Sequence, residues 1–202
     1  MEKNARIKRM QNIAASMSDD RKRRGQRLEG ELCKRLKLLL FWPIFGLLFR
    51  FVERDYAVEE YVTVYCRLDD MIPFCEIFLL PYLFWFLYLF IMHVYSFFYE
   101  PELFDKFMKF VIITYTVTIV IYFLFPNCQQ LRPTDFVRNN VLTRFMERYY
   151  AFDTDTNVCP SLHVIGSVAV MFAGFHSKQL KGIGWKSSFL LTAVSIFIST
   201  VF

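Results

Sequence analysis

Apolar residues are gathered into five runs along the chain, and polar segments separate these runs. A helix needs roughly twenty apolar residues to cross a hydrocarbon core about 30 Å thick, and long basic side chains at its ends let a shorter run suffice. Each run therefore predicts a membrane-spanning helix, and together they predict an all-α, polytopic membrane bundle. The five runs are Leu38–Val52, Ile72–Tyr99, Phe110–Phe125, Val164–Phe175 and Ser187–Phe202.

Two of the runs carry additional information. The second run is longer than one span requires, and Pro81 within it predicts a kink because proline removes an intrahelical hydrogen bond. The last run stops sixteen residues after it begins, which is short of the length that a spanning helix needs. We therefore expect residues 38–202 to be an incomplete membrane domain that continues beyond Phe202.

The polar segments predict how the spans are connected. Residues 1–37 form an N-terminal tail, which we expect to be an amphipathic surface helix that is broken or capped at Ser16–Asp20. Glu100–Lys109 predicts a short connection between the second and third spans. Pro126–Pro160 is the longest loop, and we expect a surface helix within it at Asn139–Tyr150. The apolar face of that helix is predicted to consist of Val141, Leu142, Phe145 and Tyr149.

Composition and charge strengthen the membrane assignment. Of the 202 residues, 55% are hydrophobic and 19% are aromatic, which is more than a soluble domain of this size carries. Half of the 24 basic residues lie in the first 37 positions, directly before the first apolar run. Basic clusters also bind nucleic acid, but this position favours contact with anionic lipid headgroups, so we expect membrane lipids and no nucleic acid as partners.

The distribution of charge also predicts an orientation. Glu53–Asp70 holds six acidic and two basic residues, a balance that suits the extracytoplasmic side. The segment after the fourth run instead carries positive charge, with Lys178, Lys181 and Lys186, and so belongs to the cytoplasm. We therefore expect an integral, multi-pass protein of the plasma membrane with a cytoplasmic N-terminus and an extracytoplasmic loop between spans three and four.

Several polar residues have ordinary structural interpretations. His93 lies near the inner end of the second run, where a structural role is favoured, while Glu76 near its outer end suits a structural or a functional role equally. The cysteines show neither paired spacing nor histidine neighbours, so no metal site and no cofactor are expected. Four cysteines fall near the outer face and leave disulfides open without indicating a pairing: Cys66, Cys75, Cys128 and Cys159.

The segment 157–163 ends in Pro160-Ser161-Leu162-His163 and runs directly into the fourth apolar run. Proline is favoured at the first position of a helix, so we expect the helix to start at Pro160 with unpaired N–H groups facing the loop. Such a helix end attracts anions, Ser161 adds a hydroxyl, and His163 titrates near neutral pH. The competing interpretation is an ordinary helix cap beside an incidental histidine.

Together with Arg132-Pro133 in the same outer loop, this segment resembles the type 2 phosphatidic acid phosphatase superfamily of membrane lipid phosphatases. The family's first motif is Lys, six residues, then Arg-Pro, and here Phe125 stands where the Lys belongs. Gln129 or Gln130 would then contact the phosphate in place of that Lys. The second motif corresponds to residues 160–163, and the third motif would lie in a sixth span beyond Phe202.

The resemblance implies hydrolysis of a lipid phosphate or pyrophosphate through a phosphohistidine, without metal or other cofactor. It implies that Arg132 binds the phosphoryl oxygens, that Ser161 and the Pro160 turn add donors, and that His163 protonates the leaving group. The nucleophilic histidine would belong to the third motif, so the 202-residue chain itself is expected to be inactive. The identity of the lipid is left open.

Three alternatives remain at this stage. A lipid phosphotransferase of the same fold would pass the phosphoryl group or headgroup to an alcohol instead of water. A non-catalytic membrane protein that binds phosphate would explain the missing Lys and third motif. A transporter or channel would need charged groups along several spans, and only Arg50, Glu76 and His93 are available.

Overall fold

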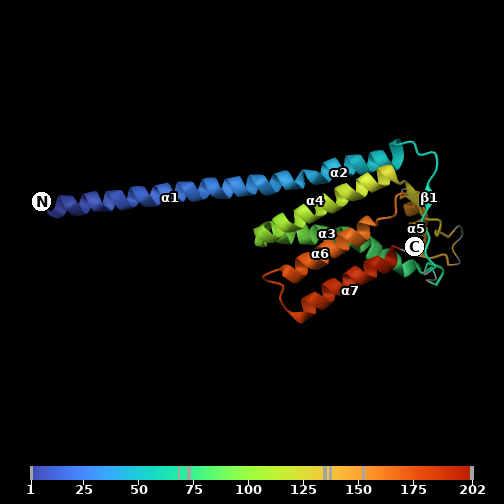
Figure 1. The fold of residues 1–202 in the computed structure, drawn as a ribbon. Helices are drawn as coiled ribbons and strands as arrows, with labels where there is room; N and C mark the ends of the chain where they lie inside the picture. Colours follow the sequence, from blue (N-terminus) through green and yellow to red (C-terminus); the bar gives the residue numbers. More distant parts are fainter. Residues whose placement is uncertain are drawn as a thin grey trace. The chain divides into compact units, whose positions relative to one another are not determined.

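The computed structural model describes the backbone of residues 2–67, 69–71, 74–133, 136, 138–151 and 153–200, and side chains from 17 onward except 18, 20, 24 and 70. The described chain is mostly helical and divides into two compact units, Met1–Leu40 and Phe41–Phe202. The expected starting point of the second span at Ile72 and the end of the last at Phe202 lie outside the described residues. Figure 1 traces the elements of both units.

The first unit consists of one helix, α1, which runs from Glu2 to Leu39. The predicted break at Ser16–Asp20 is wrong, because the helix continues through it. Lys, Arg, Glu and Leu make up much of α1, and all four are good helix formers. An i,i+4 ion pair also joins Asp19 to Arg23 at 3.1 Å.

The second unit is a bundle of helices with a polar cap of loops at one end. It contains α2 (Phe41–Arg50), the π-helical turn η1 (Phe51–Asp55), η3 (Glu76–Phe78), α3 (Leu79–Tyr99) and α4 (Pro101–Leu124). The outer loop contributes η2 (Asp69–Met71) and α5 (Val141–Tyr150), and α6 (Leu162–His176) and α7 (Ile183–Ser199) complete the bundle. Helices α3, α4, α6 and α7 lie side by side (Figure 1).

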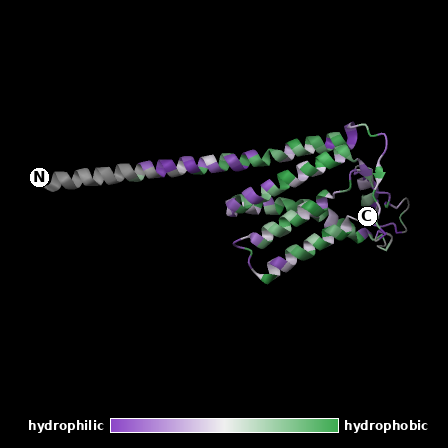
Figure 2. Cartoon of the chain, viewed as in Figure 1, coloured by the Kyte–Doolittle hydropathy of each residue, from purple (hydrophilic) through white to green (hydrophobic). Residues whose placement is uncertain are grey.

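Two helical stretches in the described part of the chain are long and apolar enough to cross a membrane. They are Glu76–Tyr99 and Pro101–Leu124, and only 33% and 39% of the residues in their apolar windows are buried inside the protein. Large side chains such as Phe90 (64% exposed) and Ile113 (63% exposed) therefore point away from the bundle. Figure 2 shows that the bundle helices consist largely of hydrophobic residues. Exposed apolar side chains on these helices are compatible with a membrane protein.

Helix α6 lies at the centre of the bundle because its side chains are small. Gly166, Ser167, Ala169, Ala173 and Gly174 are all buried and let neighbouring helices approach closely. A Cβ atom on Gly166 would lie 2.6 Å from the Tyr115 hydroxyl of α4 and 2.7 Å from Leu89 of α3. The helix thus packs against α3, α4 and α7.

Three predictions about helix boundaries are corrected. The segment Glu100–Lys109 is not a connection: α4 starts at Pro101, which is favoured at a first helical position, and Glu100 alone separates it from α3. Pro81 lies in the first turn of α3, where a missing N–H costs no helical bond, and α3 continues unbroken to Tyr99. The first apolar run is not one α-helix but α2 followed by η1.

The polar cap is held together by a short parallel sheet. Strand β1 (Val62–Thr63) pairs with β2 (Asn127–Cys128), and Cys128 also bridges to Thr156. The loop after η1 therefore lies beside the loop after α4 and the segment that precedes α6. All five cysteines of the chain are free thiols.

Helix α5 forms where a surface helix was expected, but it buries a different face. Asn140 caps it through a reciprocal capping box with Thr143. Thr143 and Met146 are the buried positions, whereas Val141 is 74% exposed and Phe145 is 45% exposed. The bundle therefore contacts the helix on the side that carries Met146, and Val141 and Phe145 of the predicted apolar face are exposed.

Candidate functional site

Arg132 is held by the loop that follows α5. Its guanidinium donates hydrogen bonds to the main-chain oxygen of Asp153, to the Asp153 carboxylate at 2.9 Å and to the main-chain oxygen of Thr154 at 2.9 Å. The ring of Tyr150 covers one face of the guanidinium, 4.4 Å away. Planar guanidinium groups suit both kinds of contact, so the side chain is fixed before any ligand arrives.

Asp153 connects this arginine to the helical bundle. Its Oδ2 accepts the ion-pair bond from Arg132 and a second hydrogen bond from the hydroxyl of Tyr82 in α3, at 3.3 Å. Burial raises the pKa of the Asp153 carboxyl above its ordinary value, and Arg132 offsets only part of that rise. A carboxylate whose pKa remains raised despite a paired arginine is poorly solvated, which is typical of a functional site.

His163 lies on the other side of Tyr82. Its ring stacks on Tyr82 with centroids 4.2 Å apart and contacts the Trp85 ring at 4.3 Å. Its Nε2 atom is buried and has no hydrogen-bond partner among the described residues. An imidazole enclosed in this way is withdrawn from solvent, and Tyr82 separates it from Arg132.

The turn before α6 is fixed by donors from α4 and from β2. The amide of Asn127 donates to the Cys159 oxygen at 2.7 Å and accepts from the Cys159 N–H at 2.8 Å. The Tyr122 hydroxyl donates to the Pro160 oxygen, and the Tyr115 hydroxyl donates to the Leu162 oxygen at 3.2 Å. These bonds fix the second motif to the bundle.

The structure corrects where the motif helix begins. Ser161 is the N-cap, with its hydroxyl accepting from the Val164 N–H at 3.4 Å, so α6 starts at Leu162. Pro160 precedes the cap and does not occupy the first helical position. Serine is a strong N-cap because its side chain satisfies an orphan N–H, and this preference outweighs that of proline.

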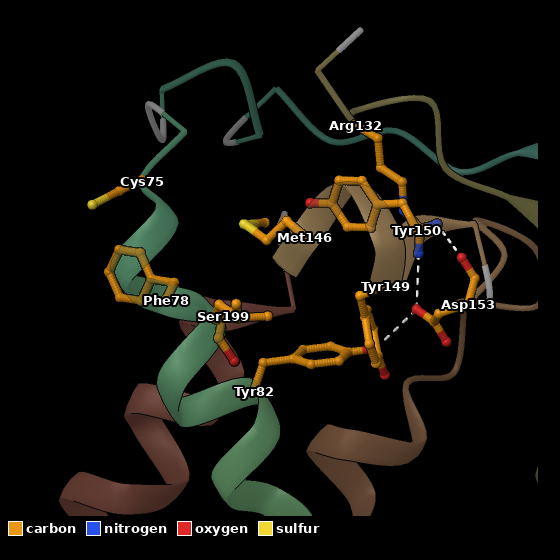
Figure 3. A pocket seen from close by; sticks show the side chains of 10 residues that line it. Cys75, Phe78, Tyr82, Arg132, Met146, Tyr149, Tyr150, Asp153 and Ser199 are labelled. Atoms are coloured by element: carbon orange, nitrogen blue, oxygen red, sulfur yellow. Dashed lines mark hydrogen bonds and ion pairs between the residues drawn. The ribbon is translucent and has the colours of Figure 1, made fainter. Parts of the chain in front are cut away.

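A small pocket lies beside Arg132, with a cavity volume of about 20 Å³, and it opens to solvent (Figure 3). Three tyrosines and Asp153 surround the guanidinium, and α3, α5 and α7 each contribute side chains. Burial, followed by the negative charge of Asp153, raises the pKa of Tyr149 to about 12, so this hydroxyl keeps its proton. The lining residues are Cys75, Phe78, Leu79, Tyr82, Arg132, Met146, Tyr149, Tyr150, Asp153 and Ser199.

The residues predicted from sequence are therefore brought together only in part. Arg132 lines the pocket, while His163 reaches it only through Tyr82 and is not among the lining residues. Gln129 offers its main-chain N–H to the Asp155 oxygen at 2.9 Å, and neither it nor Gln130 lines the pocket. Within the described part of the chain, no other side chain in the pocket replaces the missing Lys.

Sequence reasoning missed Asp153 and the tyrosines around it. The pattern offered a weak indication, because Asp153 follows an amphipathic helix and precedes the motif by a few residues. It did not identify Tyr82, which lies within an aromatic run of α3 and resembles its neighbours there.

Glu76 and His93 both have structural partners. The Glu76 carboxylate accepts from Arg138 at 3.2 Å and from Asn140 at 2.9 Å, which links η3 to the cap of α5. The ring of His93 bonds the Leu89 oxygen at 2.8 Å and accepts from the Trp42 indole N–H at 3.0 Å. Both ring nitrogens of His93 are thus satisfied, which supports the structural interpretation. Among the residues that the structure describes, no group of three or more His, Cys, Asp or Glu side chains can hold a metal ion.

Comparison with protein-family models, with curated proteins and with solved structures found no match. The geometry alone therefore indicates the chemistry. The pocket offers one guanidinium, one partly desolvated carboxylate and several hydroxyl donors, a set suited to binding an oxyanion beside an apolar group.

Proposed function

We propose that the protein is an integral-membrane lipid phosphatase that hydrolyses a lipid phosphate or pyrophosphate monoester. The observation that carries the proposal is the continuous chain of contacts Arg132–Asp153–Tyr82–His163. Arg132 and His163, which lie 31 positions apart in the sequence, are connected through Asp153 and Tyr82 at one end of a bundle whose sides are apolar. The resemblance of the two motifs to the type 2 phosphatidic acid phosphatase superfamily supplies the reaction class.

The proposal includes a topology. Helices α2, α3, α4, α6 and α7 would cross the plasma membrane, with the basic N-terminal segment in the cytoplasm and the pocket on the extracytoplasmic side. The charges support this orientation: the acidic stretch 53–70 lies at the pocket end, and Lys178, Lys181 and Lys186 lie in or beside the loop between α6 and α7. A lipid could then present its headgroup to the pocket while its tail stays in the bilayer.

In the proposed mechanism, the guanidinium of Arg132 neutralises the phosphoryl oxygens. His163 protonates the leaving oxygen, and the N-terminal end of α6 with Ser161 adds favourable dipole and hydroxyl contacts. The ring of His163 must first leave its place between Tyr82 and Trp85, because Nε2 is enclosed there. The resemblance also implies a nucleophilic histidine, and the proposal assigns that role to no described residue.

The enclosure of His163 favours one other candidate function. A membrane protein that binds lipid phosphate without cleaving it would need Arg132 and the tyrosines but no mobile histidine. Under that alternative, His163 would be a packing residue whose ring stacks on the Tyr82 ring.

The test is release of inorganic phosphate from phosphatidate by the protein in proteoliposomes. We expect His163→Ala and Arg132→Gln each to lower turnover by about a hundredfold or more, because each removes a group that acts on the transition state. The matched control is His176→Ala, which removes an exposed histidine at the other end of α6 and should leave turnover unchanged.

The outcomes separate the two candidate functions. Turnover that survives His163→Ala would remove this histidine from the reaction. Binding of phosphatidate that depends on Arg132, without turnover, would favour the non-catalytic alternative.

A further inference from the structure

The Nη2 atom of Arg132 is fully occupied in the ligand-free protein. It donates one hydrogen bond to Oδ2 of Asp153 and another to the Thr154 oxygen, each at 2.9 Å. An arginine grips phosphate through two neighbouring N–H groups, and both edges of the guanidinium that offer such a pair include Nη2. Neither edge can therefore bind a phosphate in bidentate fashion while both partners stay in place.

The partners of the guanidinium differ in how easily they can leave. The oxygens of Asp153 and Thr154 belong to the main chain of a loop that is fixed by the Asp153 N–H bond to Tyr149 and by the bond between Thr154 and Thr156. The Asp153 carboxylate is a side chain that is 33% exposed and free to rotate about its own torsions. If only the carboxylate moved away, the main-chain oxygens would still hold the arginine.

Movement of the Asp153 carboxylate would change the hydrogen bonds of Arg132 without releasing its side chain. Departure of Oδ2 would free one N–H of Nη2, while the other N–H of Nη2 would remain on the Thr154 oxygen. The Tyr150 ring would continue to cover one face of the guanidinium. The arginine would then be held in place with one N–H of Nη2 free for a ligand in the pocket that Arg132 lines.

We propose that the Asp153 carboxylate occupies the phosphate position on Arg132, and that a phosphate ester binds by replacing it. This inference rests on the proposed function, since it assumes that the pocket takes a phosphate. Asp153 thereby sets the affinity, because every ligand must displace its carboxylate. The apparent dissociation constant equals the intrinsic constant divided by the fraction of molecules in which Arg132 is open, so it is higher than the intrinsic constant. A weaker oxyanion would not displace the carboxylate.

The test measures binding of inorganic phosphate to the chain in detergent micelles by isothermal titration calorimetry. We expect Asp153→Asn to bind phosphate about three- to tenfold more tightly than the wild type, because a neutral amide holds the guanidinium less strongly than a carboxylate. The matched control is Asp155→Asn, which removes the same charge from the same loop and should change the affinity less than about twofold, as expected for a screened charge.

Each result bears on the inference in a definite way. Equal tightening in Asp153→Asn and Asp155→Asn, or none in Asp153→Asn, would overturn the inference while leaving the phosphate site intact. Absence of phosphate binding in the wild type and in Asp153→Asn would overturn both the inference and the proposed function. Binding that survives Arg132→Gln would lie elsewhere on the protein and would refute both as well.

A second variant keeps the inference testable if Asp153→Asn does not fold. Tyr82→Phe removes the hydroxyl that holds Oδ2 of Asp153 at 3.3 Å but keeps the ring that stacks on His163. We expect this change to tighten phosphate binding about twofold, in line with the loss of one long neutral-donor bond. Unchanged or weaker binding in Tyr82→Phe would count against the replacement of Asp153.

Discussion

Each end of the bundle has a carboxylate that ties α3 to a loop, and the two carboxylates differ in how fully they are satisfied. At the end away from the pocket, Glu100 accepts from the Tyr95 hydroxyl at 2.6 Å, the Ser177 hydroxyl and the Lys178 N–H at 2.8 Å. At the pocket end, the described residues that donate to the Asp153 carboxylate are Arg132 at 2.9 Å and Tyr82 at 3.3 Å. The first arrangement is a closed structural clamp, and the second leaves acceptor capacity unused.

The ionisation of the two groups reflects this difference. Burial alone would raise the pKa of Glu100, but the bonds from Lys178, Ser177 and Tyr95 outweigh it and hold the pKa below its ordinary value. For Asp153 burial prevails over Arg132, and the pKa stays above its ordinary value. In this protein the number of hydrogen bonds that a buried carboxylate accepts, more than one paired charge, decides whether its pKa is raised or lowered.

The largest effect is expected from breaking the closed clamp. Glu100→Ala would leave several donors of α3 and of the α6–α7 loop without an acceptor, so we expect unfolding in detergent to become easier by about 2–4 kcal/mol. The matched control is Glu102→Ala, since Glu102 is 82% exposed and its ion pair is with the exposed Lys178. A loss of stability in Glu102→Ala as large as that in Glu100→Ala would contradict the comparison.

The pH dependence of stability should have opposite sign at the two ends. Because the pKa of Asp153 is raised on folding, its favourable contribution is complete below the unfolded pKa of about 3.9 and is lost as pH rises through the folded value. For Glu100 the pKa is lowered, so its contribution is complete above about 4.3 and is lost as pH falls through the folded value.

Thermal unfolding in detergent across this range would measure both trends, with Asp153→Asn and Glu100→Gln as the references that no longer titrate. The wild type should lose stability relative to Asp153→Asn on raising the pH and relative to Glu100→Gln on lowering it. If the stability differences for Asp153 and for Glu100 changed with pH in the same direction, folding would shift both pKa values in the same direction, which would contradict the comparison. The ionisable groups that face Asp153, and whose side chains are retained in Asp153→Asn, are Arg132, Tyr82, Tyr149, Tyr150 and Glu53.

The smallest effect is expected from Tyr82→Phe. This change removes a single 3.3 Å bond and leaves the ring in place, so stability should fall by less than about 1 kcal/mol. The corresponding change at the closed end, Tyr95→Phe, removes a 2.6 Å bond to Glu100 and should cost more. Chemical unfolding of the two variants under one detergent condition would rank them, and the reverse order would refute the distinction between the two ends.

Much of the helical arrangement could be predicted from the sequence because it depends on local rules. The apolar runs located α4, α6 and α7, and the polar stretch before Val141 located α5. The boundaries that failed, at Pro81, Glu100 and Pro160, failed because proline is tolerated in the first turn of a helix or just before its cap. Hydropathy predicts which residues of a helix are apolar. It does not predict where the helix begins, and so it does not show whether a proline lies in the first turn.

The candidate site was predictable only as far as its motifs. Arg132 and His163 were selected because they lie in the two segments that resemble the family motifs, and of the two only Arg132 is among the described residues that line the pocket. Asp153, Tyr82 and Tyr150 could not be selected, since their importance comes from contacts with residues remote in the sequence. Nor could the sequence reveal that the ring of His163 is enclosed by Tyr82 and Trp85.

The amino-acid sequence by itself determined that the chain is helical and largely apolar, and that a guanidinium and an imidazole flank one polar loop. Helix formation and apolar character depend on the composition of short segments, so they can be predicted from neighbouring residues in the sequence. Tertiary structure alone decided that Asp153 lies on Arg132 and that Tyr82 stands between Arg132 and His163. Those contacts arise when small residues of α6 let α3 and α4 approach, and no local pattern encodes that approach.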